Sequence, residues 1–259
     1  MSDIRNYQRV VNSRSGFDST IDEGLRAYMI KVYNLMAFGL IITGVTSFLV
    51  SSLATTSDVY SASLVVRNGV VLTEFGKLIY TSPLSWIIMF SPFAVVIFMS
   101  VRLHSLSTSK ARMLFFLYSV LIGLSLSAIF LVYTNKSILQ TFFITAASFG
   151  SLSLYGYTTN RDLNPIGSFF LMGLAGIILV SLVNIFVRSS AVELALSTMG
   201  ILIFAGLTAY DTQKIKESYS GNYGSSYMDR QSIMGALMLY MDFINIFMYL
   251  LRFVGNRRD

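Results

Sequence analysis

Seven long stretches of apolar residues, separated by polar connections, dominate the sequence. Each stretch has about 20 residues, the length that an α-helix needs to cross the hydrocarbon of a bilayer. Helices are expected because they satisfy the backbone hydrogen bonds within each segment. The pattern therefore predicts an all-α polytopic membrane protein. Its seven transmembrane helices are predicted at residues 32–51, 84–101, 113–132, 138–157, 166–187, 191–216 and 232–251.

These stretches form one predicted membrane domain, residues 32–255, between a polar N-terminal tail (1–31) and a basic C-terminal tail (256–259). No secretory signal peptide is expected, because the tail lacks the short apolar core that follows the basic start of such a peptide. Two connections are longer than the others. Residues 52–81 are expected to hold a hairpin or a surface helix, and residues 212–231 include a flexible glycine-containing loop.

The composition supports a membrane protein. Only 12% of the residues are charged and 54% are hydrophobic, whereas a soluble domain has about 25% charged residues. The chain has no cysteine, so disulfides and thiolate metal sites are excluded. The net charge of +6 does not indicate nucleic-acid binding, because the basic residues lie at the ends of apolar segments. The lipid bilayer is the expected partner.

The distribution of lysine and arginine predicts a cytoplasmic N-terminus. In that orientation the tail and the even-numbered loops place twelve basic residues in the cytoplasm, against seven on the other side. The basic C-terminal tail is the exception to this rule. A re-entrant last segment, with both termini cytoplasmic, would explain it, but seven full spans are the prediction.

Two aspartates lie in or beside the apolar stretches. Asp211 follows the run Leu194–Tyr210, and Asp242 is the only charged residue within 232–251. An ionised carboxylate at bilayer depth is costly, so such residues face a protein interior or a wet cavity and usually have a function. The functional interpretation rests mainly on Asp242, because Asp211 is near a helix end, where a solvated acid costs little free energy.

The positions that share a helical face with these aspartates indicate how the last two helices pack. Asp242 shares its face with Asn245, Tyr249 and Arg252. A polar stripe in an apolar helix must face inward, so we expect the last helix to be central, surrounded by the other six. Small residues on the face of Asp211 allow a close approach between helices. We therefore expect the two faces to meet, with the two carboxyl groups in contact.

Two carboxylates in contact cannot both ionise cheaply. The pair is expected to share one proton near neutral pH and to repel once that proton is lost, unless a cation binds. Oxygen ligands suit Ca²⁺, so Asp211 and Asp242 are candidate Ca²⁺ ligands of a pH-controlled gate. In a second interpretation, each aspartate makes a separate hydrogen bond between helices and neither titrates. The residues alone favour neither interpretation.

Two aspartates on consecutive helices also describe an intramembrane aspartyl protease. The pair Tyr210-Asp211 matches the first half of that motif, but Leu239–Asp242 lacks both glycines of the second half. The Pro-Ala-Leu motif expected afterwards is absent as well. A serine protease is disfavoured because the single histidine, His104, lies outside every apolar stretch. We therefore expect neither enzymatic activity nor a cofactor.

Several segments together resemble the Bax inhibitor (TMBIM) family. The resemblance covers residues 28–255, and no single segment would be specific without the others. The matching segments are Gly123–Ser127, Ile129-Phe130, Tyr133-Thr134, Ser137-Ile138, Thr141-Phe142, Gly156–Leu163, Phe204–Gln213 and Asp242–Asn245.

The resemblance implies a seven-helix fold with the last helix at the centre. It also implies a pH-sensitive Ca²⁺ leak channel of the bacterial inner membrane, gated by an aspartate pair that corresponds to Asp211 and Asp242. In the family, an arginine on the second helix is thought to latch the first aspartate in the closed state, and Arg102 is the nearest candidate. Some bacterial relatives instead bind and restrain a membrane-bound protease. A non-transporting regulator of a protease, stress or cell-death partner is therefore the alternative.

Overall fold

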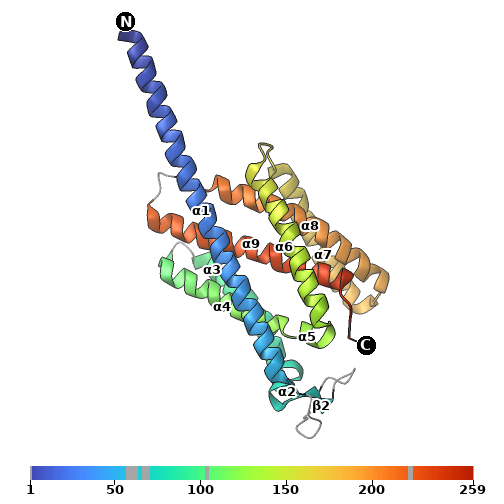
Figure 1. The fold of residues 1–259 in the computed structure, drawn as a ribbon. Coiled ribbons are helices and arrows are strands. Elements are labelled where there is room, and N and C mark those ends of the chain that lie inside the picture. The colour runs from blue at the N-terminus through green and yellow to red at the C-terminus, as the bar shows by residue number, and fades with distance from the viewer. Residues whose placement is uncertain (1, 57–63, 66–70, 103–104, 221–223, 259) are drawn as a thin grey trace.

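The computed structural model describes residues 2–56, 64–65, 71–102, 105–220 and 224–258, with side chains from residue 23 onward except at 64–65. Helices make up most of this part of the chain (Figure 1). In chain order the elements are α1 (Ser2–Ala54), β1 (Thr55–Thr56), β2 (Leu64–Val65), β3 (Val71–Leu72), α2 (Glu74–Thr81), α3 (Leu84–Arg102), α4 (Thr108–Leu126), α5 (Ile129–Val132), α6 (Asn135–Thr158), α7 (Asn164–Val187), α8 (Ser190–Glu217) and α9 (Ser225–Val254).

Seven helical segments among the described residues are long and apolar enough to cross a membrane. They are α1 from Glu23 onward, α3, α4 together with α5, α6, α7, α8 and α9. The prediction of an all-helical, multi-pass membrane protein is confirmed. Most of these helices are longer than the apolar runs, because polar residues at their ends continue the backbone hydrogen bonding. The hydroxyls of Ser107, Thr134 and Ser189, for example, cap the first turns of α4, α6 and α8.

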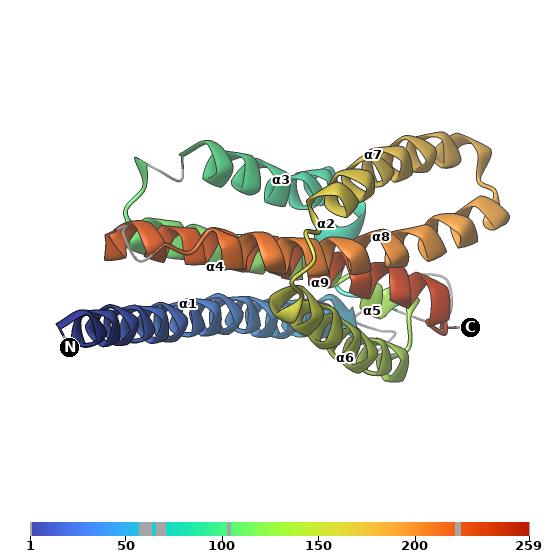
Figure 2. The ribbon, with the colours of Figure 1, turned by 90° about the horizontal axis from the view of Figure 1, so that it is seen from above.

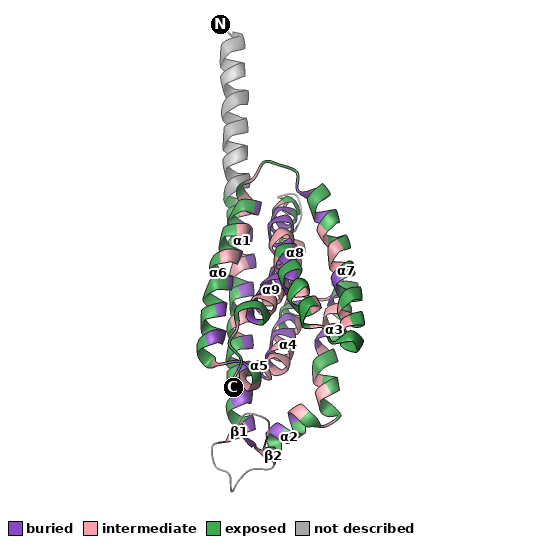
Figure 3. Cartoon of the chain, turned by 90° about the vertical axis from the view of Figure 1, so that its right-hand side faces the viewer, coloured by how far each residue is buried: buried purple, intermediate pink, exposed green. Residues whose placement is uncertain are grey.

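The last helix, α9, is the most buried of the seven candidate spans. In its apolar segment 56% of the residues are buried, against 6% in α7. Its main neighbours are α8, α1, α6 and α4. Figure 3 shows buried residues along α8 and α9, whereas the outward faces of the other helices are exposed. Of the six helices predicted to surround it, α3 packs mainly on α2 and α4, and α7 packs mainly on α8.

The third predicted span, residues 113–132, is divided into α4 and α5. The backbone N–H of Ser127 donates to the carbonyls of Gly123 and Leu124, and a new helical turn begins at Ile129. Gly123 lies against α1, where an added Cβ would be 2.8 Å from the carbonyl oxygen of Thr43. The close contact with α1 therefore lies one turn before the break.

The connection between the first two spans contains both predicted kinds of structure. The strands β1, β3 and β2 form a small antiparallel sheet in that order, and the amphipathic helix α2 follows. The hydroxyl of Thr73 caps α2 by accepting from the N–H of Gly76 (3.1 Å). A Cβ at Gly76 would be 2.1 Å from the carbonyl oxygen of Ala54, so α2 is fixed against the end of α1. Phe75 and Leu78 are exposed on its outer face, as in helices that lie at a membrane interface.

The two ends of the chain lie at opposite ends of the bundle (Figures 1 and 2). The helix α9 is unbroken from Ser225 to Val254 and is long enough to cross a membrane. The residues after it pair with the connection between α5 and α6. Thr134 donates to the carbonyl of Asn256 (3.1 Å), and Arg258 donates to the carbonyl of Val132 (2.9 Å). Seven helices of the described chain are thus long and apolar enough to span a membrane, and seven full spans remain the prediction.

Candidate functional site

Asp211 and Asp242 meet in the interface between α8 and α9, the two helices with the most extensive packing. Their carboxyl groups are close enough to interact through their charges and through a hydrogen bond. Asp242 is only 4% exposed, and its Oδ2 atom is buried without a partner from any other described residue. Asp211 is partly buried. The two acids therefore form one unit inside the bundle, with Asp211 on its more accessible side.

The positions of the two acids along their helices fit this difference in exposure. With a rise of 1.5 Å per residue, Asp242 lies about 25 Å from the start of α9 and about 18 Å from its end. Asp211 lies about 9 Å from the end of α8 by the same rise. The exposed side chain of Lys214 follows one turn later and interacts electrostatically with Asp211. Of the helix ends considered, the end of α8 is therefore the nearest to the pair.

The contact between the carboxyl groups has a direct chemical consequence. A hydrogen bond between two carboxyl groups requires that one of them carries a proton, because two ionised carboxylates have only acceptors. Removing that proton would leave two negative charges in contact, in a place with little water to screen them. The arrangement can therefore exist in two states, one joined by a shared proton and one that repels.

About two helical turns from the pair, toward the C-terminal end of α9, an aromatic side chain brings α8 and α9 into close contact. The ring of Tyr249 stacks on Phe204, with 5.8 Å between the ring centroids. It also lies over Gly200, where an added Cβ would be 2.6 Å from the Tyr249 ring. The small residue on α8 thus makes room for the ring on α9, which fixes how the two helices pack beside the acids.

The other members of the predicted polar stripe have different surroundings. Asn245 is partly buried, and its amide donates to the carbonyl of Met241 within its own helix (2.9 Å). Arg252 is exposed and lies over the ring of Tyr249, 5.9 Å from its centroid. Of these three residues, Tyr249 has its ring against α8, whereas Arg252 is exposed.

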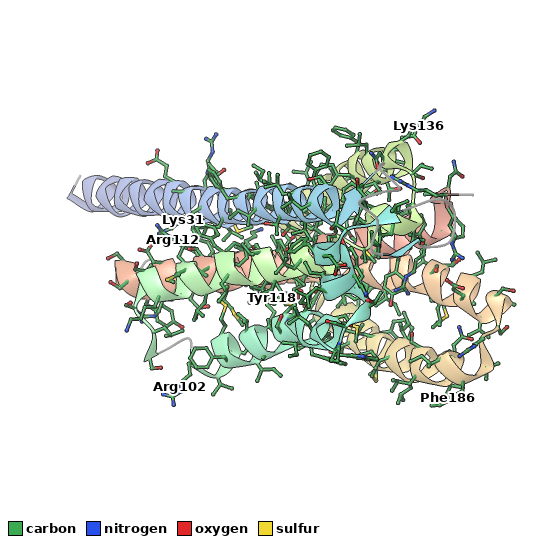
Figure 4. All side chains as sticks on the ribbon, turned by 90° about the horizontal axis from the view of Figure 1, so that it is seen from below. Lys31, Arg102, Arg112, Tyr118, Lys136 and Phe186 are labelled. Carbon is green, nitrogen blue, oxygen red and sulfur yellow. The ribbon has the colours of Figure 1, made fainter. Side chains whose placement is uncertain are left out.

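Arg102, the candidate latch, lies on a helix that packs mainly away from the α8–α9 interface. It is the last residue of α3, it is exposed, and its side chain points away from the rest of the bundle (Figure 4). The helix α3 packs mainly on α2 and α4 rather than on α8 or α9. The structure therefore does not bring Arg102 to Asp211. His104, set aside above as a catalytic base, lies outside the described residues.

Comparison with known proteins assigns the family. A family model described as "Inhibitor of apoptosis-promoting Bax1" matches residues 25–259. The chain belongs to the Bax inhibitor family. It is 45% identical to "Uncharacterized protein RP147" of Rickettsia prowazekii, over 93% of this chain and 94% of the relative. It is 41% identical to "Inner membrane protein YbhL" of Escherichia coli K12, over 91% and 94% of the two chains. The name of YbhL agrees with the predicted location.

In this Bax inhibitor protein, the three residues Tyr210–Thr212 each contact a different helix. The ring of Tyr210 covers Gly167 on α7, where an added Cβ would be 2.4 Å from the ring. Asp211 meets Asp242, and the hydroxyl of Thr212 is hydrogen-bonded to that of Ser153 on α6 (2.9 Å). This segment, which is part of the resemblance to the family, therefore joins α8 to α6, α7 and α9.

A chain of hydroxyl groups beside the acid pair was not predicted from the sequence. The hydroxyl of Tyr33 on α1 is hydrogen-bonded to Ser153 (2.6 Å), which is bonded in turn to Thr212. Thr212 also donates to the carbonyl of Thr208 (2.7 Å). The one sequence feature that could have indicated this network is that Thr212 directly follows Asp211. The network ties α1 and α6 to the segment of α8 that carries the acid.

A second polar cluster on α9 also lacked a sequence signal. Tyr240 is fully buried, and its hydroxyl is 2.5 Å from that of Thr43 on α1. Since Thr43 donates its only proton to the carbonyl of Ser119 (2.9 Å), Tyr240 is the donor in this pair. The rings of Phe115 and Tyr118 meet Tyr240 edge-on. The cluster anchors α9 to α1 and α4, two residues before Asp242.

Gln213 holds the connection between α6 and α7 through both the nitrogen and the oxygen of its side-chain amide. Its Nε2 donates to the carbonyl of Arg161 (2.8 Å), and its Oε1 accepts from the N–H of Leu163 (2.9 Å). Gln213→Glu would place a carboxylate oxygen against the Arg161 carbonyl at a buried site. We expect it to cost about 1–3 kcal/mol, measured as a lower unfolding temperature in detergent.

Gln140→Glu is the matched control for this change, because Gln140 is exposed on α6. It makes the same chemical change without a buried carbonyl to repel. We expect its unfolding temperature to equal that of the wild type. Equal unfolding temperatures for the two variants would show that Gln213 does not hold this connection.

The part of the chain that the structure describes has no group of three or more histidine, cysteine or acidic side chains that could hold a metal ion. Asp211 and Asp242 alone supply up to four carboxylate oxygens, whereas Ca²⁺ takes about 6–8 oxygen ligands. Water or backbone carbonyls would have to complete the coordination. The pair therefore fits a transient contact with a passing ion better than a permanent binding site.

Proposed function

We propose that this Bax inhibitor protein is a passive Ca²⁺ leak channel of the bacterial inner membrane, with a cytoplasmic N-terminus. The observation that carries the proposal is the contact between two carboxyl groups in the main helix interface of a membrane-spanning bundle. Ionisable residues inside a membrane are rare and mark ion or proton pathways. The basic residues in the predicted cytoplasmic loops support the orientation, and the name of YbhL supports the inner membrane.

In the proposed closed state, Asp211 and Asp242 share one proton. The resulting hydrogen bond links α8 to α9 where Asp242 is buried, so it closes the bundle at that level. A charge-assisted hydrogen bond of this kind is roughly twice as strong as a neutral one. The shared proton also removes the repulsion that would otherwise separate the helices.

In the proposed open state, the proton has left and the two carboxylates repel. Two unit charges 4 Å apart interact by about 4 kcal/mol at an effective dielectric constant of about 20. Since about 1.4 kcal/mol changes an equilibrium tenfold, such a repulsion is large enough to shift the bundle from closed to open. The exposed Lys214 reduces the charge on the side of Asp211, so Asp242 is expected to drive the separation.

The separated carboxylates would then attract a cation. Their oxygens are the ligand type that Ca²⁺ prefers, and we propose that Asp211 and Asp242 contact the ion in passing. Protons and Ca²⁺ would thus compete for the same oxygens. Acid would close the channel by restoring the shared proton, and alkaline conditions would open it.

The wild-type protein in liposomes tests this proposal. We expect passive Ca²⁺ efflux to rise severalfold between about pH 6 and about pH 8, because the shared proton is lost over this range. The measurement uses a fluorescent Ca²⁺ indicator, and protein-free liposomes of the same lipid give the background. Efflux at the background level at every pH would overturn the channel proposal.

The alternative function is a regulator that binds a membrane protein without transporting ions. It rests on the polar N-terminal tail, residues 1–31, which precedes the first apolar stretch of the sequence. Background efflux in the liposome experiment, with a folded protein, would favour this alternative.

We propose no catalytic activity for the aspartate pair. A peptide bond would have to reach both carboxyl groups, whereas Asp242 is almost completely buried by the packing of α9 against its neighbours. The departures from the protease motif at Leu239–Asp242 support the same conclusion.

A further inference from the structure

A cavity of about 510 Å³ lies between α3 and the α4–α5 segment, at the end of the bundle that holds the C-terminus. Ile88 and Met89 form one wall, and Leu124, Ala128 and Leu131 form the other. Leu124, Ala128 and Leu131 are three or four residues apart, as are Ser85 and the pair Ile88 and Met89, so each set occupies one helical face. The volume is in the range of small-molecule sites, about 300–1,000 Å³. The cavity is therefore a mostly apolar cleft between two helical segments.

The polar side chains that line the cavity already have hydrogen-bond partners. The hydroxyl of Ser125 donates to the carbonyl of Ile88 (3.0 Å), and that of Ser85 donates to the carbonyl of Ser82 (2.7 Å). The hydroxyl of Tyr80 donates to Ser127 (2.9 Å), and burial raises the pKa of Tyr80, so it keeps this proton. The walls consequently suit a hydrocarbon chain better than a polar ligand.

Two arginines from the C-terminal segment form one end of the cavity. The guanidinium of Arg258 donates to the carbonyl of Tyr133 (3.2 Å) and to the side chain of Asn135 (2.9 Å), which hold it in place. Arg257 is 3.4 Å from Glu193, but both side chains are largely exposed, at 63% and 49%. Such a surface ion pair is weak, so Arg257 can exchange it for a phosphate, which arginine binds through two parallel hydrogen bonds.

The cavity lies where a lipid can reach it. The amphipathic helix α2, which contributes Ile79 and Tyr80, has Phe75 and Leu78 exposed on its outer face. Trp86, at the start of α3, is 61% exposed, and tryptophan is enriched where a membrane meets water. These residues place the arginine end of the cavity near the lipid headgroups, on the side of the membrane opposite the N-terminus.

We propose that this cavity binds an anionic phospholipid of the surrounding leaflet. One acyl chain lies between Met89 and Leu131, and the phosphate binds Arg257 beside Arg258. Charge complementarity selects the headgroup, and the apolar walls select the chain. The bound lipid joins the C-terminal segment to α2, α3 and α5. This site is separate from the aspartate pair, and the proposal does not depend on the channel function.

Native mass spectrometry of the full-length protein in detergent tests the headgroup preference. The probes are phosphatidylglycerol and phosphatidylcholine with identical acyl chains. We expect about tenfold tighter binding of phosphatidylglycerol, because charge-assisted hydrogen bonds to the phosphate are joined by the negative net charge of that lipid. Arg257→Gln should bring the ratio close to one. Arg188→Gln is the matched control, since Arg188 is exposed on the same side of the bundle and does not line the cavity.

A second variant tests the chain-binding part of the cavity. Ala128→Phe fills the cleft and should weaken the binding of both lipids at least about tenfold. Ala147→Phe, at an exposed position of α6, should bind both lipids as the wild type does. Should Ala128→Phe fail to fold, a phosphatidylglycerol with a photoreactive acyl chain locates the site in the wild type. We expect labelling of the segments around Met89 and Leu131.

Three results would overturn the proposal. The first is equal binding of the two lipids, and the second is an unchanged ratio in Arg257→Gln. The third is photolabelling confined to helices that do not line the cavity. Each would mean that the cleft is ordinary lipid-facing surface.

Discussion

Asp242→Asn should abolish the pH dependence of Ca²⁺ efflux and hold it near the low level of the wild type at acidic pH. The amide is close to the carboxyl group in shape, but it does not lose a proton over this range. Its NH₂ group can donate permanently to the carboxylate of Asp211, its partner in the structure. In the wild type, the ratio of deprotonated to protonated pairs changes about 100-fold over two pH units. Efflux at about pH 8 should therefore fall severalfold in the variant, to nearly its value at about pH 6.

Glu217→Gln is the control for this variant, because it removes a carboxylate from an exposed position near the end of α8. It should keep the wild-type efflux at both pH values. The double variant Asp211→Asn, Asp242→Asn should resemble Asp242→Asn, since neither position can then bind or release a proton. A wild-type pH profile in the double variant would eliminate the aspartate pair as the gate.

Gly156→Ala should destabilise the protein strongly, because the added methyl group meets the backbone of a neighbouring helix. The added Cβ would be 2.2 Å from the carbonyl oxygen of Ala209 and 2.9 Å from its Cα. Both are backbone atoms of α8, which cannot rotate away as a flexible side chain would. Overpacking typically costs about 1–3 kcal/mol and occasionally more, and we expect the upper end here. Thermal unfolding in detergent measures the loss.

Gly150→Ala is the matched control on the same helix, because a Cβ at Gly150 meets nothing within 4 Å. Alanine favours helix over glycine by about 1 kcal/mol, so this variant should be as stable as the wild type or slightly more stable. Since Ala209 is two residues before Asp211, Gly156→Ala should also disturb the acid pair. Equal stability of the two variants would contradict the close contact between α6 and α8.

The seven spans could be predicted from the sequence, because uninterrupted apolar runs of membrane length have few alternative structures. The meeting of Asp211 and Asp242 could also be anticipated, since helical periodicity places each on an inward face. The break after Leu126 was not predicted. It depends on the local backbone hydrogen bonds of Ser127, within a stretch that reads as continuously apolar.

Other features depend on contacts between distant parts of the chain. Tyr240 lies 197 positions from Thr43, and no local pattern indicates that their hydroxyl groups meet. The sequence could place Arg102 at the end of a helix but could not predict where its side chain points. In the structure the side chain points outward. The cavity requires the C-terminal segment to reach α5, which only the fold reveals.

The shared proton of Asp211 and Asp242 is the centre of this account, and infrared difference spectroscopy in liposomes measures it directly. We expect the C=O stretching band of a protonated carboxyl group at acidic pH. The band should disappear over the same pH range in which Ca²⁺ efflux rises, and Asp242→Asn should lack this titrating band. A wild-type spectrum without such a band at the acidic pH where efflux is low would contradict the account.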